Sequence, residues 1–301
     1  MPRRAGAAEP HSQSGLPHPP VLDSPLFHNW AVRLRQAGPA ADRAGGAELM
    51  LRAYRRLLAA WNRRFNLVSR DADLDALLED AIVDAAALSR VLPAAGRVAD
   101  IGAGAGLVAL CLSLLRPGRL VLVEPRRRRA SFLRRLAGLD WQAESRGASP
   151  GPAGETIPDG PSTTSTIAPS PGAESRGTSP GPAGETIPDG PSTVPLCGLD
   201  WTVLCARVEE LTPDDGHEGP PWTAVYTRAV WKPAVAWRVC RRLLKPGGQL
   251  ICLAGPREPL PGADWRESSY DGLLPDVGRR SAHRLLIRRL ENTGTSTAIP
   301  E

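Results

Sequence analysis

The sequence has few cysteines, and none is placed for a disulfide framework or a zinc site. Its five cysteines are scattered and form no C-x-x-C pair, the spacing typical of such sites. Long apolar runs are also missing: the longest, Leu107 to Leu115, falls well short of the about 20 residues that a helix needs to cross a bilayer. The first 20 residues hold no apolar segment of the kind found in secretion signals. These absences predict a cytoplasmic protein with reduced cysteines, no membrane segment and no metal site.

Lysine is nearly absent, because 35 of the 37 basic residues are arginine. Arginine is suited to bidentate contact with phosphates and to stacking on bases. A bias toward GC-rich codons explains the same skew without any function. The composition alone leaves both explanations open.

A repeated segment interrupts the chain. The string AESRGASPGPAGETIPDGPST at 143–163 returns at 173–193 with one change, and GLDW occurs at 138–141 and again at 198–201. We interpret residues 142–201 as a duplicated insertion within a helix-to-strand connection. Its Pro, Gly, Ser and Thr content predicts a disordered surface loop. The insertion has a net charge of −5, so the other 241 residues carry +10, a balance that suits a polyanionic partner.

The rest of the chain predicts an α/β domain between loose tails at 1–45 and 293–301. The domain comprises 46–141 and 202–292, and its first part, 46–93, is a helical extension. Hydrophobic patterning predicts a helix that begins at Ala47 and has Leu49, Ala53, Leu57 and Trp61 on one stripe. It also predicts helices at 74–92, 107–115, 126–139 and 234–244, and strands at 97–101, 120–124, 202–206, 224–227, 249–254 and 283–290. This alternation predicts a doubly wound, mostly parallel sheet with the last strand antiparallel at an edge. Such sheets bind ligands beyond the carboxyl ends of their strands.

The first predicted strand ends in a loop with alternating glycines. The spacing is D-x-G-x-G-x-G, from Asp100 through Gly102 and Gly104 to Gly106. The dinucleotide fingerprint does not fit, since its third glycine would fall on Leu107. The observed spacing is the first motif of Rossmann-like methyltransferases that use S-adenosyl-L-methionine. Without Cβ atoms the loop can approach the methionine part of this cofactor, and the following helix offers free N–H groups. A glycine-rich turn without a ligand is the alternative.

An acidic residue ends the second predicted strand. Glu124 follows Gly102 by 22 residues, and an acid at about this separation is placed to accept hydrogen bonds from ribose hydroxyls. Stabilisation of the following helix, which starts with Pro125, is the alternative. The arginines that come next, including Arg126 and Arg127, fit either a solvated helix face or contacts with RNA phosphates.

The sequence lacks residues that two other methyl acceptors would need. Methylation of the adenine amino group usually goes with [DN]-P-P-[YF] after the fourth strand, where this chain has Arg228 and Ala229. No cysteine stands in the setting typical of the nucleophile in cytosine C5 methylation. A ring nitrogen with a free lone pair, such as guanine N7, needs only alignment with the sulfonium methyl and a stabilising field. The absence of both the adenine-specific motif and a nucleophilic cysteine therefore favours a ring nitrogen as the methyl acceptor.

On several segments together, the chain resembles the bacterial 16S rRNA guanine-N7 methyltransferases, the RsmG or GidB family. The segments are the glycine loop, WNRRFNLVS at 61–69, SFL at 131–133, ARVEE at 206–210 and TRAV at 227–230. The resemblance implies that Gly102 and Leu107 contact S-adenosyl-L-methionine and that Val208 and Glu209 frame its adenine. It implies that Arg228 lines the cofactor and substrate cleft.

The resemblance also implies a partner, which is 16S rRNA or the small ribosomal subunit, and makes Arg207 a candidate contact with RNA. The residues themselves leave simpler roles open. Val208 is equally compatible with the core, and Arg207 and Arg228 with salt bridges.

Three segments depart from the pattern of this family. Where the family has R-H-x-x-D-S, this chain has DAIVDA at 80–85, which keeps only Asp84. Where the family has G-[LF]-P-G, it has GLVA at 106–109. The Lys-Gly that follows the family's fifth strand is Ala-Gly at 254–255 here, with Arg257 nearby. Two other functions therefore stay open. One is a methyltransferase retargeted to another RNA site or a small molecule, and the other is a non-catalytic RNA- or ribosome-binding protein.

Overall fold

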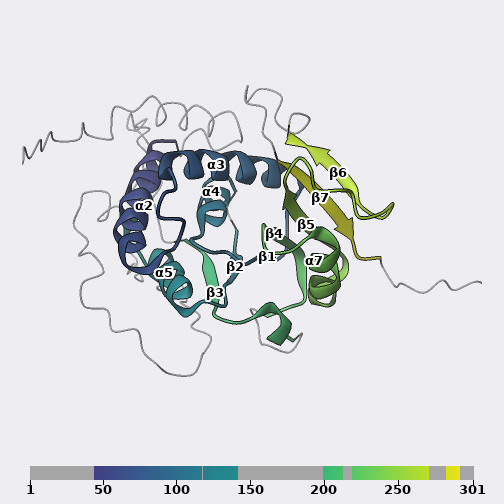
Figure 1. The fold of residues 1–301 in the computed structure, drawn as a ribbon. Helices are drawn as coiled ribbons and strands as arrows, with labels where there is room; N and C mark the ends of the chain where they lie inside the picture. The colour runs from purple at the N-terminus through teal and green to yellow at the C-terminus, as the bar shows by residue number, and fades with distance from the viewer. Residues whose placement is uncertain (1–43, 117, 142–198, 213–218, 271–282, 292–301) are drawn as a thin grey trace, which may run out of the picture.

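The computed structural model of the chain describes residues 44–116, 118–141, 199–212, 219–270 and 283–291, and these form a seven-stranded sheet with helices around it (Figure 1). The predicted tails, apart from Ala44 and Gly45, and most of the predicted insertion lie outside the described residues. The first described helix begins at Ala44, and the chain is described again from Leu199.

Five parallel strands form the main part of the sheet, as the alternation of helices and strands predicts. They are β1 (Val98–Ile101), β2 (Leu120–Val123), β3 (Trp201–Leu204), β4 (Trp222–Arg228) and β5 (Leu244–Ala254). In space their order is β3-β2-β1-β4-β5, and each neighbouring pair is parallel. β3 begins at Trp201, one residue before the predicted boundary of the domain, because Trp201 pairs with Leu120 of β2.

Two antiparallel strands complete the sheet, and one of them is unexpected. β7 (Arg284–Arg289) pairs with β5 in antiparallel fashion, as predicted for the last strand. The predicted place at the edge is wrong, because β6 (Arg266–Ser269) pairs with the other side of β7. The sequence of β6, RESS, lacks the apolar alternation by which a strand is usually detected.

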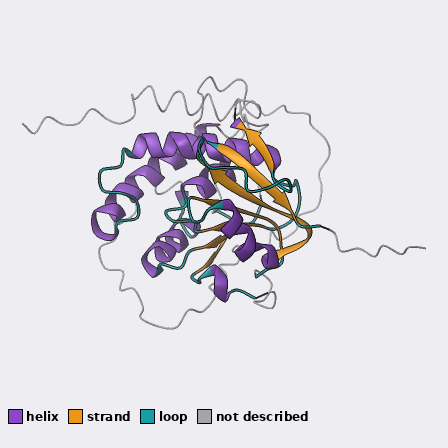
Figure 2. Cartoon of the chain, turned by 45° about the vertical axis from the view of Figure 1, so that its right-hand side comes forward, coloured by secondary structure: helices purple, strands orange, loops and turns teal. Residues whose placement is uncertain are grey.

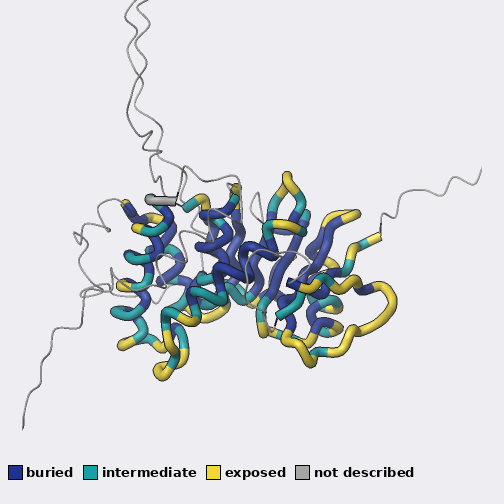
Figure 3. Tube along the Cα trace, turned by 90° about the horizontal axis from the view of Figure 1, so that it is seen from above, coloured by how far each residue is buried: buried dark blue, intermediate teal, exposed yellow. Residues whose placement is uncertain are grey.

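Helices cover both faces of the sheet (Figure 2). One face is covered by α2 (Ala44–Phe65), α3 (Leu74–Val91), α4 (Leu107–Leu115) and α5 (Arg127–Ala137), and the other by α7 (Pro233–Cys240) with the short 3-10 helices η3 (Val208–Glu210) and η4 (Arg241–Leu243). Alternate residues of β2 pack into the two layers: Leu122 faces the first and Val121 the second. Burial on both faces explains why the parallel strands are continuously apolar, and it is visible along the centre of the molecule (Figure 3).

The segment with the sequence WNRRFNL has a structural role at the end of α2. Trp61 is buried and packs against Phe132 of α5 with 5.3 Å between ring centroids. The side-chain oxygen of Asn62 accepts a hydrogen bond from the N–H of Val68 at 2.9 Å, which closes the turn after the helix. Asn66 has a φ of +48°, a left-handed conformation that asparagine tolerates better than most residues. On the same helix Leu49 lies outside the buried face, since it is 46% exposed.

Candidate functional site

A cavity of about 390 Å³ lies at the carboxyl ends of β1 and β2. The residues that line it are Ile101, Gly102, Val123, Glu124, Pro125, Arg126, Arg129, Arg207, Val208, Glu209, Ala229, Val230 and Trp231. They include four of the predicted cofactor-binding residues and two of the predicted RNA-binding residues. This is the edge at which a doubly wound sheet is expected to bind a ligand.

The glycine loop forms one wall of this cavity, and its alternating pattern has a conformational cause. Gly102, Gly104 and Gly106 have φ angles of +76°, +60° and +77°, a region that side chains with a Cβ rarely adopt. A Cβ at Gly102 would lie 2.5 Å from the Cγ2 atom of Val230, which also lines the cavity, and one at Gly106 would lie 2.7 Å from a methyl carbon of Leu133. Gly102 therefore keeps the cavity open, whereas Gly106 permits packing beneath the loop.

Glu124 joins the two elements that border the cavity. Its side chain is buried with 3% exposure, and its two carboxylate oxygens accept hydrogen bonds from the N–H of Gly104 at 3.0 Å and of Arg126 at 2.8 Å. The carboxylate thus fixes the glycine loop and the start of α5 at once. Each oxygen has a second lone pair, so the same group still has acceptor capacity for a ligand.

The opposite wall is the η3 turn, which contains Val208 and Glu209. Val208 is buried and packs into the same core layer as α7, so the core role that the sequence leaves open is observed, and it lines the cavity as well. The guanidinium of Arg242 donates hydrogen bonds to the carbonyl oxygens of Val208 at 2.8 Å and Glu209 at 3.0 Å, and also to that of Leu211 at 2.5 Å. Nothing in the sequence pattern distinguishes Arg242, because its role depends on carbonyls more than 30 residues away.

Replacing Arg242 by Ala removes the hydrogen bonds that its guanidinium donates to these three carbonyls, and only the carbonyl of Val208 keeps another donor, the N–H of Leu211 at 3.3 Å, among the described residues. Because hydrogen bonds to a charged group contribute about 1.5–3 kcal/mol when they are shielded and less when the group is exposed, we expect a loss of about 1–2 kcal/mol in the free energy of unfolding. Urea denaturation followed by circular dichroism measures it. Replacing the neighbouring exposed Arg241 by Ala is the matched control and should cost less than about 0.5 kcal/mol.

Four predicted residues do not line this cavity, and the fourth, Arg228, lies in a second pocket described below. Leu107 is half-buried as the first residue of α4 and packs against the core. Gly104 reaches the site through its hydrogen bond to Glu124. Arg127 is exposed in the first turn of α5.

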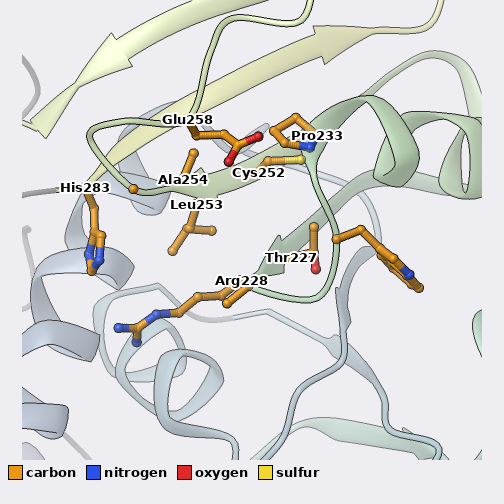
Figure 4. A pocket seen from close by; sticks show the side chains of 11 residues that line it. Thr227, Arg228, Pro233, Cys252, Leu253, Ala254, Glu258 and His283 are labelled. Atoms are coloured by element: carbon orange, nitrogen blue, oxygen red, sulfur yellow. The ribbon is translucent and has the colours of Figure 1, made fainter.

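Arg228 lies in a second, neighbouring pocket of about 260 Å³ at the ends of β4 and β5 (Figure 4). Ala229 and Trp231 line both cavities. The guanidinium of Arg228 forms an ion pair with the fully buried carboxylate of Asp84, at 3.1 Å. The salt-bridge role that the sequence leaves open for Arg228 is therefore observed, and its partner is the residue retained from the R-H-x-x-D-S pattern.

Asp84 also binds two residues from the far end of the chain. The hydroxyl of Tyr270 donates a hydrogen bond to Oδ1 of Asp84 at 2.7 Å, and Nδ1 of His283 lies 3.3 Å from the same oxygen. The hydrogen bond with Asp84 raises the pKa of His283 above 6.5, although partial burial opposes the shift. Four side chains from four separate segments thus meet beside the second pocket.

The raised pKa of His283 makes the stability of the protein depend on pH. The protonated imidazolium stabilises the folded state through Asp84, so this contribution is fully present below about pH 6.5 and is lost as the pH rises through the raised pKa of the folded state. We expect the stability difference between the wild type and His283→Gln to shrink between about pH 6 and pH 9. Urea unfolding across this range measures it. A difference that does not change with pH would contradict the assignment.

Asp100, whose carboxyl group lies beneath the glycine loop, has a raised pKa. Burial raises the pKa of Asp100 to about 7, the charge of Glu124 adds to the shift, and Tyr226 and Arg228 partly offset it. Asp100 begins the D-x-G-x-G-x-G motif and lies on β1 behind the cavity. It is therefore partly protonated near neutral pH, unlike an exposed aspartate.

The strand order of the sheet and the position of the cavity define the fold class of the protein. The strand order β3-β2-β1-β4-β5-β7-β6, with β7 antiparallel, is that of the Rossmann-like fold of S-adenosylmethionine-dependent methyltransferases. The glycine loop after β1 and an acid after β2 stand at the positions where this fold binds its ligand. The predicted fold class is confirmed.

Comparison with known proteins finds a family that part of the chain resembles. The family model GidB, described as rRNA small subunit methyltransferase G, matches residues 48–139. The match ends just before the segment predicted as an insertion.

The chain spans about half the length of the curated relatives it matches. It is 38% identical over 112 residues to "Ribosomal RNA small subunit methyltransferase G" of Desulfotalea psychrophila, covering 36% of this chain and 51% of the relative. It is 38% identical over 118 residues to the protein of the same name from Granulibacter bethesdensis, covering 38% and 54%. Among solved structures, a methyltransferase from Geobacter sulfurreducens is similar with a TM-score of 0.39 and 12% identity over 80% of this chain and 88% of that chain.

Two other kinds of site are absent from the described residues. No helix in these segments is long and apolar enough to cross a membrane. Within the same segments, no group of three or more His, Cys, Asp and Glu side chains is arranged to hold a metal ion.

Proposed function

We propose that the protein is an S-adenosyl-L-methionine-dependent methyltransferase whose acceptor is N7 of a guanine in 16S rRNA. The observation that carries the proposal is the first cavity, which lies between the glycine loop and η3 at the carboxyl ends of β1 and β2. The family model that matches residues 48–139, described as rRNA small subunit methyltransferase G, supports the same reaction class and the same RNA.

The residues that line the cavity suit the methionine, ribose and adenine parts of S-adenosyl-L-methionine in turn. The exposed backbone at Gly102 suits the methionine part, which needs close approach to the chain. The carboxylate of Glu124 has acceptor capacity for the ribose hydroxyls. Val208 offers an apolar surface for the adenine, and Glu209 lies beside it at the rim. Bound there, the cofactor would supply an electrophilic methyl group.

The chemistry asked of the protein is modest. Guanine N7 has a free lone pair, so transfer needs no base and no covalent intermediate on the enzyme. The chain must hold donor and acceptor in line and exclude water from the path between them. The buried Glu124 and the glycine loop that it holds provide the rigid side of that arrangement.

The direct test uses small ribosomal subunits from the source organism with the gene deleted. Incubation with the intact protein and methyl-labelled S-adenosylmethionine should introduce one methyl group per 16S rRNA. Mass spectrometry of the digested RNA should identify it as 7-methylguanosine. Label at another nucleoside would support retargeting, for which Ala254, in place of the family's Lys, gives a reason. RNA binding without transfer would instead support a non-catalytic protein.

The arginines at the mouth of the cavity are proposed to contact RNA phosphates. Arg126, Arg127 and Arg207 are exposed, and the first and last of them line the cavity. Replacing all three by Gln should make the plot of log K for RNA binding against log salt concentration less steep, by about 3 in slope. Each phosphate contact contributes about 1 to the steepness. Filter binding of 16S rRNA at several salt concentrations measures the slope. The control is Arg266→Gln, an exposed arginine on β6 at the far edge of the sheet; an equal change in both proteins would refute the assignment.

A further inference from the structure

The second pocket combines apolar walls with charges of both signs. Cys252, Leu253 and Pro233 line it together with Arg228, Glu258 and His283. Arg228 and His283 lie on one side, where both reach the buried Asp84, and the carboxylate of Glu258 lies on the other (Figure 4). An apolar pocket with a few fixed polar groups is the usual form of a small-ligand site.

Glu258 is fixed through its backbone, while its carboxylate is available. Its N–H donates to the carbonyl oxygen of Gly255 at 3.2 Å, and its own carbonyl oxygen accepts a hydrogen bond from Arg284 of β7. Within the described segments its carboxylate has no hydrogen bond or ion pair, although it lines the pocket. A carboxylate in this state offers two oxygens, each able to accept from a ligand.

The opposite side of the pocket presents hydrogen-bond donors. Asp84 is fully buried and pairs with the guanidinium of Arg228, which fixes that side chain at the pocket wall. A guanidinium has five N–H donors in a planar fork, more than the single contact to Asp84 uses. The pocket is therefore complementary to a ligand that has two neighbouring hydrogen-bond donors at one edge and a hydrogen-bond acceptor at another.

We propose that the second pocket receives the guanine to be methylated and that Glu258 determines its selection. This rests on the proposed function. Guanine flipped out of the RNA presents N1–H and the N2 amino group as adjacent donors on its Watson–Crick edge, which the two oxygens of Glu258 accept. O6 is then the acceptor for Arg228. Adenine has an acceptor at N1 and a donor at N6, so it meets a carboxylate and a guanidinium with the wrong groups.

This orientation also suits the reaction. N7 lies on the side of the purine away from N2, so a base held at Glu258 directs N7 away from that carboxylate. Ala229 and Trp231 line this pocket and the cofactor cavity alike. The two cavities therefore adjoin at the place where a methyl group has to pass from donor to acceptor.

The test measures the binding of free nucleotides to the intact protein saturated with S-adenosylhomocysteine, so that the first cavity is filled. Saturation-transfer NMR compares guanosine, inosine and adenosine monophosphates. We expect guanosine to bind about tenfold more tightly than inosine, which lacks the N2 amino group, and adenosine more weakly still. In Glu258→Gln this preference should fall to less than about threefold, with unchanged affinity for S-adenosylhomocysteine. Glu291→Gln, which removes an exposed carboxylate outside both cavities, should keep the preference.

Three outcomes overturn the inference: no nucleotide binding by the wild type, no preference for guanosine, or a preference that persists in Glu258→Gln. Failure of the proposed function is distinguishable, because then S-adenosylhomocysteine itself does not bind. If S-adenosylhomocysteine binds and the guanosine preference is absent, the role of Glu258 alone is refuted.

Discussion

Replacing Glu124 by Gln is expected to weaken the binding of S-adenosylmethionine about 100-fold. The carboxylate is buried and accepts hydrogen bonds from the N–H groups of Gly104 and Arg126. Gln has the same shape, but its amide nitrogen is a donor and would oppose one of these two donors. The variant therefore loses the position of the glycine loop, the start of α5 and a charged acceptor for the ribose. Hydrogen bonds to charged groups contribute about 1.5–3 kcal/mol each, and 1.4 kcal/mol corresponds to a factor of ten.

Titration calorimetry measures this affinity, and urea denaturation of the same samples separates it from a loss of stability. Glu267→Gln is the matched control, because it makes the same chemical change on β6, away from both cavities. It should leave the affinity within a factor of two. An unchanged affinity in Glu124→Gln would show that the carboxylate serves only the loop and the helix start.

Replacing Asp84 by Leu is expected to lower the free energy of unfolding by about 3–5 kcal/mol. The carboxylate is fully buried and binds Arg228, Tyr270 and His283. Removing it leaves the guanidinium of Arg228 and the hydroxyl of Tyr270 without their partner. Breaking a buried pair on one side costs this much because the remaining charge is no longer compensated.

A double-mutant cycle distinguishes the pair from simple packing. Removing both partners in Asp84→Leu with Arg228→Leu should recover at least about 1 kcal/mol relative to the sum of the two single changes. Chemical denaturation of the four proteins at pH 7 gives the coupling energy. Strict additivity of the two changes would contradict the ion pair as the source of the stability.

The sequence predicted the parallel part of the sheet because its strands are buried on both faces. Continuous apolar runs such as Leu120–Val123, separated by helical patterns, have few other interpretations. The glycine loop and Glu124 were predictable for a similar reason, since the chemistry of the site lies within one strand–loop–helix unit. β6 was not predictable, because its four polar residues become a strand only through pairing with β7.

The second pocket was beyond sequence reasoning, because it is assembled from distant parts of the chain. Asp84 and Arg228 come from α3 and β4, His283 comes directly before β7, and nothing local to any of them indicates the others. The same is true of Arg242, whose hydrogen bonds reach the η3 turn. Glu258 follows β5 in a turn that sequence patterning describes only as a loop. Such residues become candidates only when the fold brings their segments together.

Titration calorimetry of the intact chain with S-adenosylmethionine shows whether the cavity between the glycine loop and η3 binds this ligand. The wild type should bind one equivalent. Gly102→Val should abolish the binding, because its side chain would clash with Val230 and enter the cavity. Absence of binding by the wild type, or saturable binding of a nicotinamide dinucleotide in place of S-adenosylmethionine, would contradict the account.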